Sequence, residues 1–152
     1  MEIEWWQIFD TLLHVGIAFL LALPLGLDRE EKDRSAGLRT FPLVAVAACG
    51  FMLVGILEFP DSPDGRARVA YGIITGIGFI GGGAILKDGG SVSGTATAAS
   101  LWNTGAIGLA VANRRYEIAI ALAILNYAVL SIGRKLKKEI GEQPADDHLQ
   151  DH

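Results

Sequence analysis

Residues Gly72–Trp102 read GIITGIGFIGGGAILKDGGSVSGTATAASLW, and the architecture of the whole chain follows from them. Nine glycines lie between Gly72 and Gly94, and no charged residue lies between Val69 and Leu86. In water, each glycine weakens a helix by roughly 1 kcal/mol relative to alanine. In a bilayer, small residues instead let helix backbones approach closely. We therefore predict a membrane helix, in preference to a glycine-rich loop of a soluble protein. Its predicted packing positions are Gly72, Gly76, Gly78, Gly81, Gly82 and Gly83.

Four further charge-free segments accompany this run, and apolar residues make up 51% of the 152-residue chain. The five segments have 16 to 23 residues each, close to the ~20 that a helix needs to cross ~30 Å of hydrocarbon. They are Thr11–Leu27, Thr40–Leu57, Val69–Leu86, Ser91–Asn113 and Ile118–Gly133. This pattern predicts an all-α fold, a polytopic membrane helix bundle of about five transmembrane helices.

The basic residues predict how the bundle is oriented. Nine of the thirteen follow the first, third and fifth spans, and four lie on the opposite side. The positive-inside rule then places the N-terminus outside and the C-terminus in the cytoplasm. Glu2 and Glu4 stand where a signal peptide would carry basic residues, so the first apolar run is expected to remain as a membrane helix.

Residues 1–138 are expected to form the transmembrane domain, and the acidic residues 139–152 a disordered cytoplasmic tail. The charged residues after Leu27 read as a helical extension that ends at Gly37, and Thr40 is placed to cap the second helix. Residues 58–68 are expected to form an outer loop and residues 86–94 a turn.

Several classes of function find no support in the composition. Outside the positions that flank the spans there is no basic face for nucleic acid. No nucleophile has a base nearby and no metal-binding cluster is evident, so we expect no catalysis and no cofactor. Lys87 is not followed by Ser or Thr, which excludes a P-loop. The single cysteine, Cys49, is expected to be a small buried apolar residue.

Charged residues beside the first two spans are candidates for function. Arg29 and Arg39 each adjoin a span, where they would contact lipid headgroups or a carboxylate of a partner. A magnesium site formed by Asp28, Glu30 and Glu31 is conceivable because hard cations prefer carboxylate oxygens. Four basic residues in the same segment argue against it, so the metal assignment stays open.

The fourth span carries unusually many polar side chains. Thr97, Ser100 and Thr104 recur at helical spacing and form one stripe. Such a stripe either hydrogen-bonds to neighbouring helices or lines a path for an ion or substrate. Trp102 lies off the stripe and is a candidate packing anchor.

The first span carries Asp10 and His14 one turn apart, and Asp28 five turns after Asp10. Two interpretations are open. The three residues belong to a polar pathway through the membrane, or the two aspartates mark its two interfaces.

Five motifs together resemble those of the MgtC/SapB family of bacterial inner-membrane proteins. They are GLDRE (Gly26–Glu30), AGLRT (Ala36–Thr40), GIGFIGGGAI (Gly76–Ile85), GTATAASLW (Gly94–Trp102) and AIG (Ala106–Gly108). The resemblance implies a five-helix membrane domain, a link to growth in low magnesium and, in pathogens, survival inside macrophages. Some family members add a soluble cytoplasmic domain after the last helix, whereas only about twenty residues follow Gly133 here.

The resemblance also implies which residues act and on what. Family members have been proposed as accessories of magnesium transport and as regulators that bind other membrane proteins, including the ATP synthase. Carried onto this sequence, the functional set is Asp28, Arg29, Glu30, Arg39, Thr40, the Gly76–Gly83 run, Thr97, Ser100, Trp102 and Asn103. We therefore expect a non-enzymatic regulator or accessory protein, with a magnesium or other small-ion transporter as the alternative. Exposed glycine faces predict self-association, most simply as a homodimer.

Overall fold

The computed structural model describes residues 4–30, 36–88 and 91–141, with the backbone alone at 30, 88, 91 and 133–141. Within these ranges the chain forms five helices and a two-stranded antiparallel sheet. The helices are α1 (Trp5–Glu30), α2 (Thr40–Glu58), α3 (Pro63–Gly83), α4 (Thr95–Ala112) and α5 (Tyr116–Gly141); the strands are β1 (Leu86–Asp88) and β2 (Ser91–Ser93). Each predicted span overlaps one helix, so the all-α class is confirmed.

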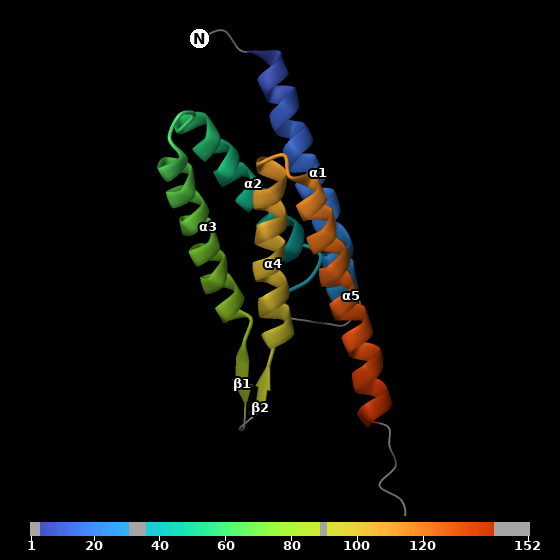
Figure 1. Ribbon diagram of the computed structural model, residues 1–152. Coiled ribbons are helices and arrows are strands. Elements are labelled where there is room, and N and C mark those ends of the chain that lie inside the picture. Colours follow the sequence, from blue (N-terminus) through green and yellow to red (C-terminus); the bar gives the residue numbers. More distant parts are fainter. Residues whose placement is uncertain (1–3, 31–35, 89–90, 142–152) are drawn as a thin grey trace, which may run out of the picture.

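Helix α4 is the centre of the bundle and packs against all four other helices (Figure 1). The α2–α3 and α4–α5 turns lie at one end, which we call the outer end, near the first turns of α1. The β1–β2 sheet lies at the opposite, inner end, toward which α5 also runs. Helix α4 has 18 residues and α2 has 19, or about 27 to 29 Å at 1.5 Å per residue, close to the hydrocarbon thickness.

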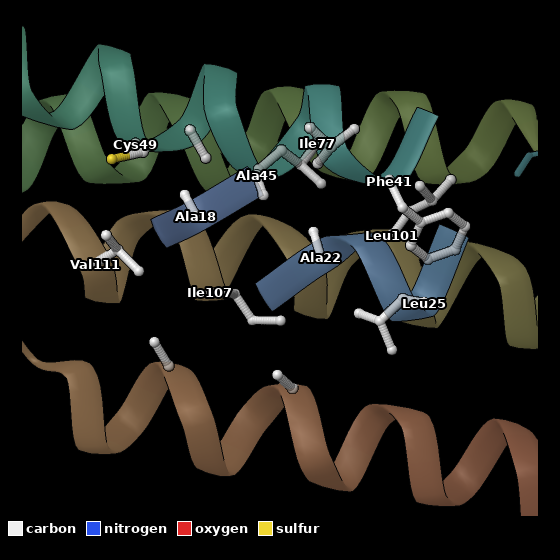
Figure 2. Packing of buried hydrophobic residues seen from close by; sticks show 14 of the residues in the cluster. Ala18, Ala22, Leu25, Phe41, Ala45, Cys49, Ile77, Leu101, Ile107 and Val111 are labelled. Atoms are coloured by element: carbon white, nitrogen blue, oxygen red, sulfur yellow. The ribbon is translucent and has the colours of Figure 1, made fainter. Parts of the chain in front are cut away.

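The core between α1, α2 and α4 is built largely from small side chains (Figure 2). Ala18 and Ala22 of α1 and Ala45 and Cys49 of α2 belong to this core, and all four are fully buried. Cys49 is thus buried as predicted. Small side chains let the helix backbones come close to each other, and such close packing is how helices associate in a bilayer.

Large apolar side chains point outward along the whole bundle. Phe79 is 87% exposed, and Trp5, Tyr71, Leu43 and Val129 are exposed as well. A protein in water rarely carries so extended an apolar surface, whereas lipid solvates it. By length and hydropathy alone, α1 (Trp5–Arg29) and α2 qualify as membrane spans, and Tyr116–Ile132 is a shorter apolar segment. The bundle is a membrane protein.

The element boundaries differ from the prediction at three places. Ser62 caps α3 by accepting a hydrogen bond from the backbone N–H of Gly65 at 3.1 Å, so half of the expected outer loop is helix. The cap of α2 is Arg39 and not Thr40; the Gly37 carbonyl accepts the Thr40 N–H at 3.1 Å. The expected turn at 86–94 contains the β1–β2 ladder, in which Lys87 pairs with Val92.

Two further expectations concern the segments at the inner end. Helix α5 continues to Gly141 and so includes the first three residues of the expected tail, 139–141; residues 142–152 lie outside the described residues. The predicted extension of α1 toward Gly37 also falls partly outside them, at residues 31–35.

The predicted packing glycines of α3 are mostly not packed within the chain. Only Gly81 meets a neighbour, the backbone of Ala98 on α4. The other five have open space where a side chain would stand: Gly72, Gly76, Gly78, Gly82 and Gly83. Close approaches occur instead at Gly108, where a methyl group would collide with the Ala45 carbonyl oxygen, and at Gly105, where it would collide with Ile77. Glycine spacing alone does not indicate which face of a helix meets a neighbour of the same chain, so packing at these five glycines stays a prediction.

Candidate functional site

The polar stripe of α4 is buried, and it joins α4 to α5. The Ser100 hydroxyl donates to Oδ1 of Asn126 at 2.7 Å, and Nδ2 of Asn126 donates back to the Ser100 carbonyl at 3.2 Å. The Thr104 hydroxyl donates to the same carbonyl at 2.8 Å. On α5, the Leu122 carbonyl accepts a bond from Asn103 Nδ2 at 3.2 Å. Within the stripe, Ser100 therefore hydrogen-bonds to a neighbouring helix, as one of the two interpretations predicted, whereas Thr104 hydrogen-bonds within α4.

Asn126 is a site residue that the sequence patterns did not predict. It is buried on α5 and pairs with Ser100, which lies 26 positions earlier in the chain. One signal was available: Asn126 is the only amide side chain in the charge-free run Ile118–Gly133. A polar group within a span usually faces the bundle.

A cavity of about 680 Å³ lies beside this hydrogen-bonded pair, toward the inner end. Its walls come from the last turn of α1, the end of β2, the first half of α4 and the middle of α5. The lining residues are Arg29, Val92, Ser93, Gly94, Thr95, Ala96, Thr97, Ala99, Ser100, Asn103, Leu122, Leu125, Asn126, Val129 and Leu130. We call this space the inner cavity. Arg29 supplies its charge, and hydroxyl and amide groups supply its remaining polar surface.

The inner cavity unites four of the nine predicted functional residues: Arg29, Thr97, Ser100 and Asn103. Arg29 is only 5% exposed, and its neighbour Asp28 is buried as well but does not line the cavity. The side chain of Glu30 lies outside the described residues. The structure thus separates the two arginines that adjoin spans, because Arg39 is exposed at the start of α2.

Two predicted functional residues do not join this site. Thr40 is half-buried in the first turn of α2 and does not line the cavity. Trp102 is 52% exposed on α4, so about half of its surface is open to contacts outside the chain, and its role as a packing anchor stays a prediction. An outward tryptophan on a membrane helix contacts lipid or another protein. For the proposed magnesium ligands, Glu31 lies outside the described residues, and the described residues contain no group of three or more His, Cys, Asp or Glu side chains that could hold a metal ion.

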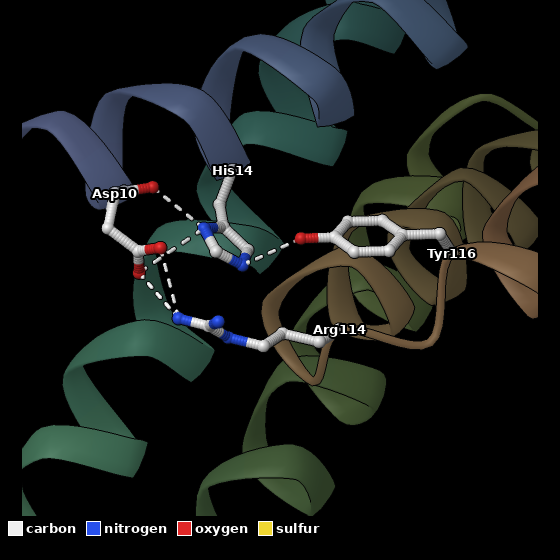
Figure 3. Close-up of polar contacts among 4 residues, drawn as sticks. All are labelled: Asp10, His14, Arg114 and Tyr116. Carbon is white, nitrogen blue, oxygen red and sulfur yellow. Dashed lines mark hydrogen bonds and ion pairs between the residues drawn. The ribbon is translucent and has the colours of Figure 1, made fainter.

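A second polar cluster closes the outer end of the bundle (Figure 3). Nη2 of Arg114 donates to both carboxylate oxygens of Asp10, at 3.0 and 2.9 Å. His14 is 1% exposed, and its Nδ1 lies 2.7 Å from the Asp10 carbonyl oxygen. Since a carbonyl can only accept, Nδ1 carries a hydrogen, and Nε2 lies within hydrogen-bond distance of the Tyr116 hydroxyl oxygen, at 3.0 Å. The cluster ties α1 to the α4–α5 turn.

Asp10 lies in the second turn of α1 and Asp28 in its last turn, with His14 one turn after Asp10. Asp10 finds its charge partner in Arg114, 104 positions away. The spacing of Asp10 and His14 in the first span predicted that these two residues lie close together. It did not predict their contacts with Arg114 and Tyr116, because those contacts depend on how α1 and α5 pack.

Comparison with known proteins finds relatives along most of the chain. The MgtC family profile matches residues 15–139. Protein MgtC of Salmonella typhimurium (strain LT2) is 36% identical over 136 residues, covering 90% of this chain and 58% of that protein. The protein slr0014 of Synechocystis is 37% identical over 135 residues, covering 89% of this chain and 57% of that protein.

A third relative is YhiD of Escherichia coli (strain K12), which is named as a candidate magnesium transporter. It is 32% identical over 133 residues, covering 84% of this chain and 62% of YhiD. This chain therefore spans about three fifths of the length of the curated relatives it matches. The comparison with solved structures gave no significant match. The family profile covers most of the chain and the relatives align along most of it, so the chain belongs to the MgtC family.

Proposed function

We propose that this chain is a non-enzymatic, multi-pass protein of the bacterial inner membrane that regulates or assists magnesium homeostasis. Membership of the MgtC family and the name of YhiD support the link to magnesium. The names of these relatives state no catalytic activity. The proposed orientation places the outer end outside the cell, as the distribution of basic residues predicts.

The charge of the inner cavity is the observation that favours a regulator over a cation pathway. None of the cavity-lining side chains in the described part of the chain is Asp or Glu, and Arg29 contributes a positive charge. Magnesium binds through carboxylate and phosphate oxygens and keeps much of its water. A buried guanidinium repels such a cation, whereas the hydroxyl and amide groups offer it no compensating charge.

The alternative is a magnesium transporter or channel component, and one observation favours it. Asp28 is buried next to Arg29 at the inner end of α1. A second copy of the chain would bring a second Asp28, and paired carboxylates are typical of cation pathways.

Magnesium flux separates these two functions. The purified protein is reconstituted in liposomes that contain a magnesium-sensitive dye, and magnesium is added outside. The regulator proposal predicts no flux above that of protein-free liposomes, together with restored low-magnesium growth in a host that lacks its own family member. Flux that Asp28→Asn abolishes would reject the regulator. The matched control is Asp64→Asn, which changes an exposed aspartate at the outer end.

A homodimer is part of the same proposal. A groove of about 660 Å³ runs between α2 and α3, and Gly72 and Gly76 line it with open space beside them. A helix from a second copy would find close backbone contact there. Light scattering in mild detergent should give twice the mass of the chain, and Gly76→Ile should reduce it to one chain. Gly78→Ile is the control, because Gly78 also has open space beside it but does not line the groove.

The proposed partners are other inner-membrane proteins, such as the ATP synthase. The exposed Trp102 offers them a contact surface on α4. Photo-crosslinking from position 102 in native membranes tests this contact. Recovery of self-contacts alone would contradict it.

A further inference from the structure

The inner cavity combines a buried positive charge with hydrogen-bond donors. Arg29 is 5% exposed and carries a planar guanidinium, which binds two phosphate oxygens at once. Thr97 adds a hydroxyl from α4. The first turn of α4 also lines the cavity, and its amides have no carbonyl partner within the helix. Gly94, at the cap position, has no side chain to accept from those amides. These groups together attract an anion.

The opposite wall of the inner cavity is apolar. Leu122, Leu125, Val129 and Leu130 of α5 line it. Leu125 and Val129 are 62% and 69% exposed, so the cavity opens sideways, onto the surface that faces lipid. Its volume of about 680 Å³ lies within the roughly 300–1,000 Å³ that is usual for small-molecule sites. A ligand that fits both walls has an anionic head and an apolar tail.

We propose that the inner cavity binds the headgroup phosphate of an anionic phospholipid, with an acyl chain lying along Leu125 and Val129. Arg29 and the first turn of α4 hold the phosphate. A zwitterionic headgroup carries a cation beside its phosphate, which the guanidinium and the positive end of the helix disfavour. The inference goes beyond the magnesium-linked role, because lipid binding at this cavity requires no magnesium.

Lipid titration of the purified protein tests the proposal. The protein is kept in mild detergent with a chelator, and phosphatidylglycerol or phosphatidylcholine is added while native mass spectrometry counts the bound lipids. We expect phosphatidylglycerol to bind preferentially and Arg29→Gln to weaken it about tenfold, the loss expected for one charge-assisted hydrogen bond. Lys87→Gln is the matched control: Lys87 is exposed in β1 at the same end but does not line the cavity. Equal binding of both lipids, or an unchanged affinity in Arg29→Gln, would overturn the proposal.

A second variant covers the case in which Arg29→Gln does not fold. Val129→Trp fills the cavity from an exposed position, so the fold should be retained, as checked by helical circular dichroism, while phosphatidylglycerol is lost. Inorganic phosphate distinguishes a soluble anion from a lipid. Phosphate should compete weakly and leave the apolar wall empty. If phosphate binds as well as the lipid, and Val129→Trp leaves lipid binding unchanged, the lipid assignment is wrong.

Discussion

Ser100 and Asn126 carry two reciprocal hydrogen bonds between the helices α4 and α5. One bond joins the two side chains and the other joins the Asn126 amide to the Ser100 backbone, so the two residues do not contribute equally. Because lipid offers no competing hydrogen bonds, such pairs hold helices together at about 0.6–2 kcal/mol each.

We therefore expect Asn126→Ala to destabilise the protein more than Ser100→Ala does, because it removes both bonds. The double variant should lose less unfolding free energy than the two single variants lose together, since one hydrogen bond is shared. Unfolding in mixed micelles measures these free energies. Thr75→Ala is the control, because the Thr75 hydroxyl bonds only to the Tyr71 carbonyl of its own helix. Additive costs would contradict the shared bond.

Arg114 occupies a position that usually belongs to glycine. Its φ of 58° is left-handed, and its N–H bonds to the Val111 carbonyl while the Arg115 N–H bonds to the Ala110 carbonyl. This is the Schellman geometry that ends a helix. A non-glycine residue there costs about 1 kcal/mol or more, close to what an exposed ion pair returns. The ion pair between Arg114 and Asp10 therefore offsets most of the strain of the left-handed backbone at Arg114.

The two substitutions of Arg114 should consequently differ. Arg114→Gly loses the ion pair but relieves the left-handed backbone, so stability should change by less than about 0.5 kcal/mol. Arg114→Ala loses the pair and keeps the strain, so it should be destabilised by about 1 kcal/mol. Thermal unfolding in detergent compares them. If both variants lose the same stability, the left-handed backbone carries no strain at this position.

Glu117 gives the outer turn a dependence on pH. Its pKa is lowered first by a hydrogen bond from its own backbone and then by Arg115, whose Nε donates to Oε1 at 2.6 Å. Because the pKa of Glu117 is lowered in the folded protein, its carboxylate stabilises the fold at pH values above the usual pKa of 4.5. This contribution is lost as the pH falls below 4.5 and through the lowered pKa.

Measurement of that pKa by NMR in micelles should give a value below 4.5. In Arg115→Gln the pKa should rise but stay below 4.5, because the backbone bond is the larger cause. A pKa at or above 4.5 in the unmodified protein would contradict both hydrogen bonds.

Helix α4 depends on two glycines that bring other helices close to it. Gly108 meets the backbone of α2 and Gly105 meets Ile77 of α3. Gly108→Ala should therefore cost about 1–3 kcal/mol through overpacking. Gly50→Ala should be neutral or slightly stabilising, because a methyl group at Gly50 of α2 would meet nothing within 4 Å and alanine favours helix. Chemical unfolding of both variants provides the comparison, and equal stabilities would show that α2 and α4 do not pack closely at Gly108.

Sequence patterns predicted the helices but not which of their faces meet. The five spans and the buried stripe Thr97, Ser100 and Thr104 followed from hydropathy and helical spacing. The Ser62 cap of α3 was visible in principle, as Ser-Pro-Asp is a typical helix start, but the prolines were interpreted as a loop. Partners separated by 26 or 104 positions, Asn126 and Arg114, depend on packing that no local pattern encodes.

At the scale of the whole molecule, the two polar clusters lie at opposite ends of the bundle. The outer cluster ties α1 to the α4–α5 turn, and the inner cavity gathers Arg29, the start of α4 and the middle of α5. Between them, the core consists largely of small apolar residues. The proposed orientation requires that α4 cross the membrane, so that Lys87 before it and Asn113 after it lie on opposite sides.

Cysteine accessibility at these two positions tests that requirement most directly. Cys49, the single native cysteine, is first replaced by alanine, and Lys87→Cys and Asn113→Cys are made separately; both positions are exposed. In intact cells a membrane-impermeant maleimide should label position 113, and it should label position 87 only after the membrane is permeabilised. Labelling of both positions from the same side would contradict the crossing of α4 and the placement of the inner cavity at the cytoplasmic face.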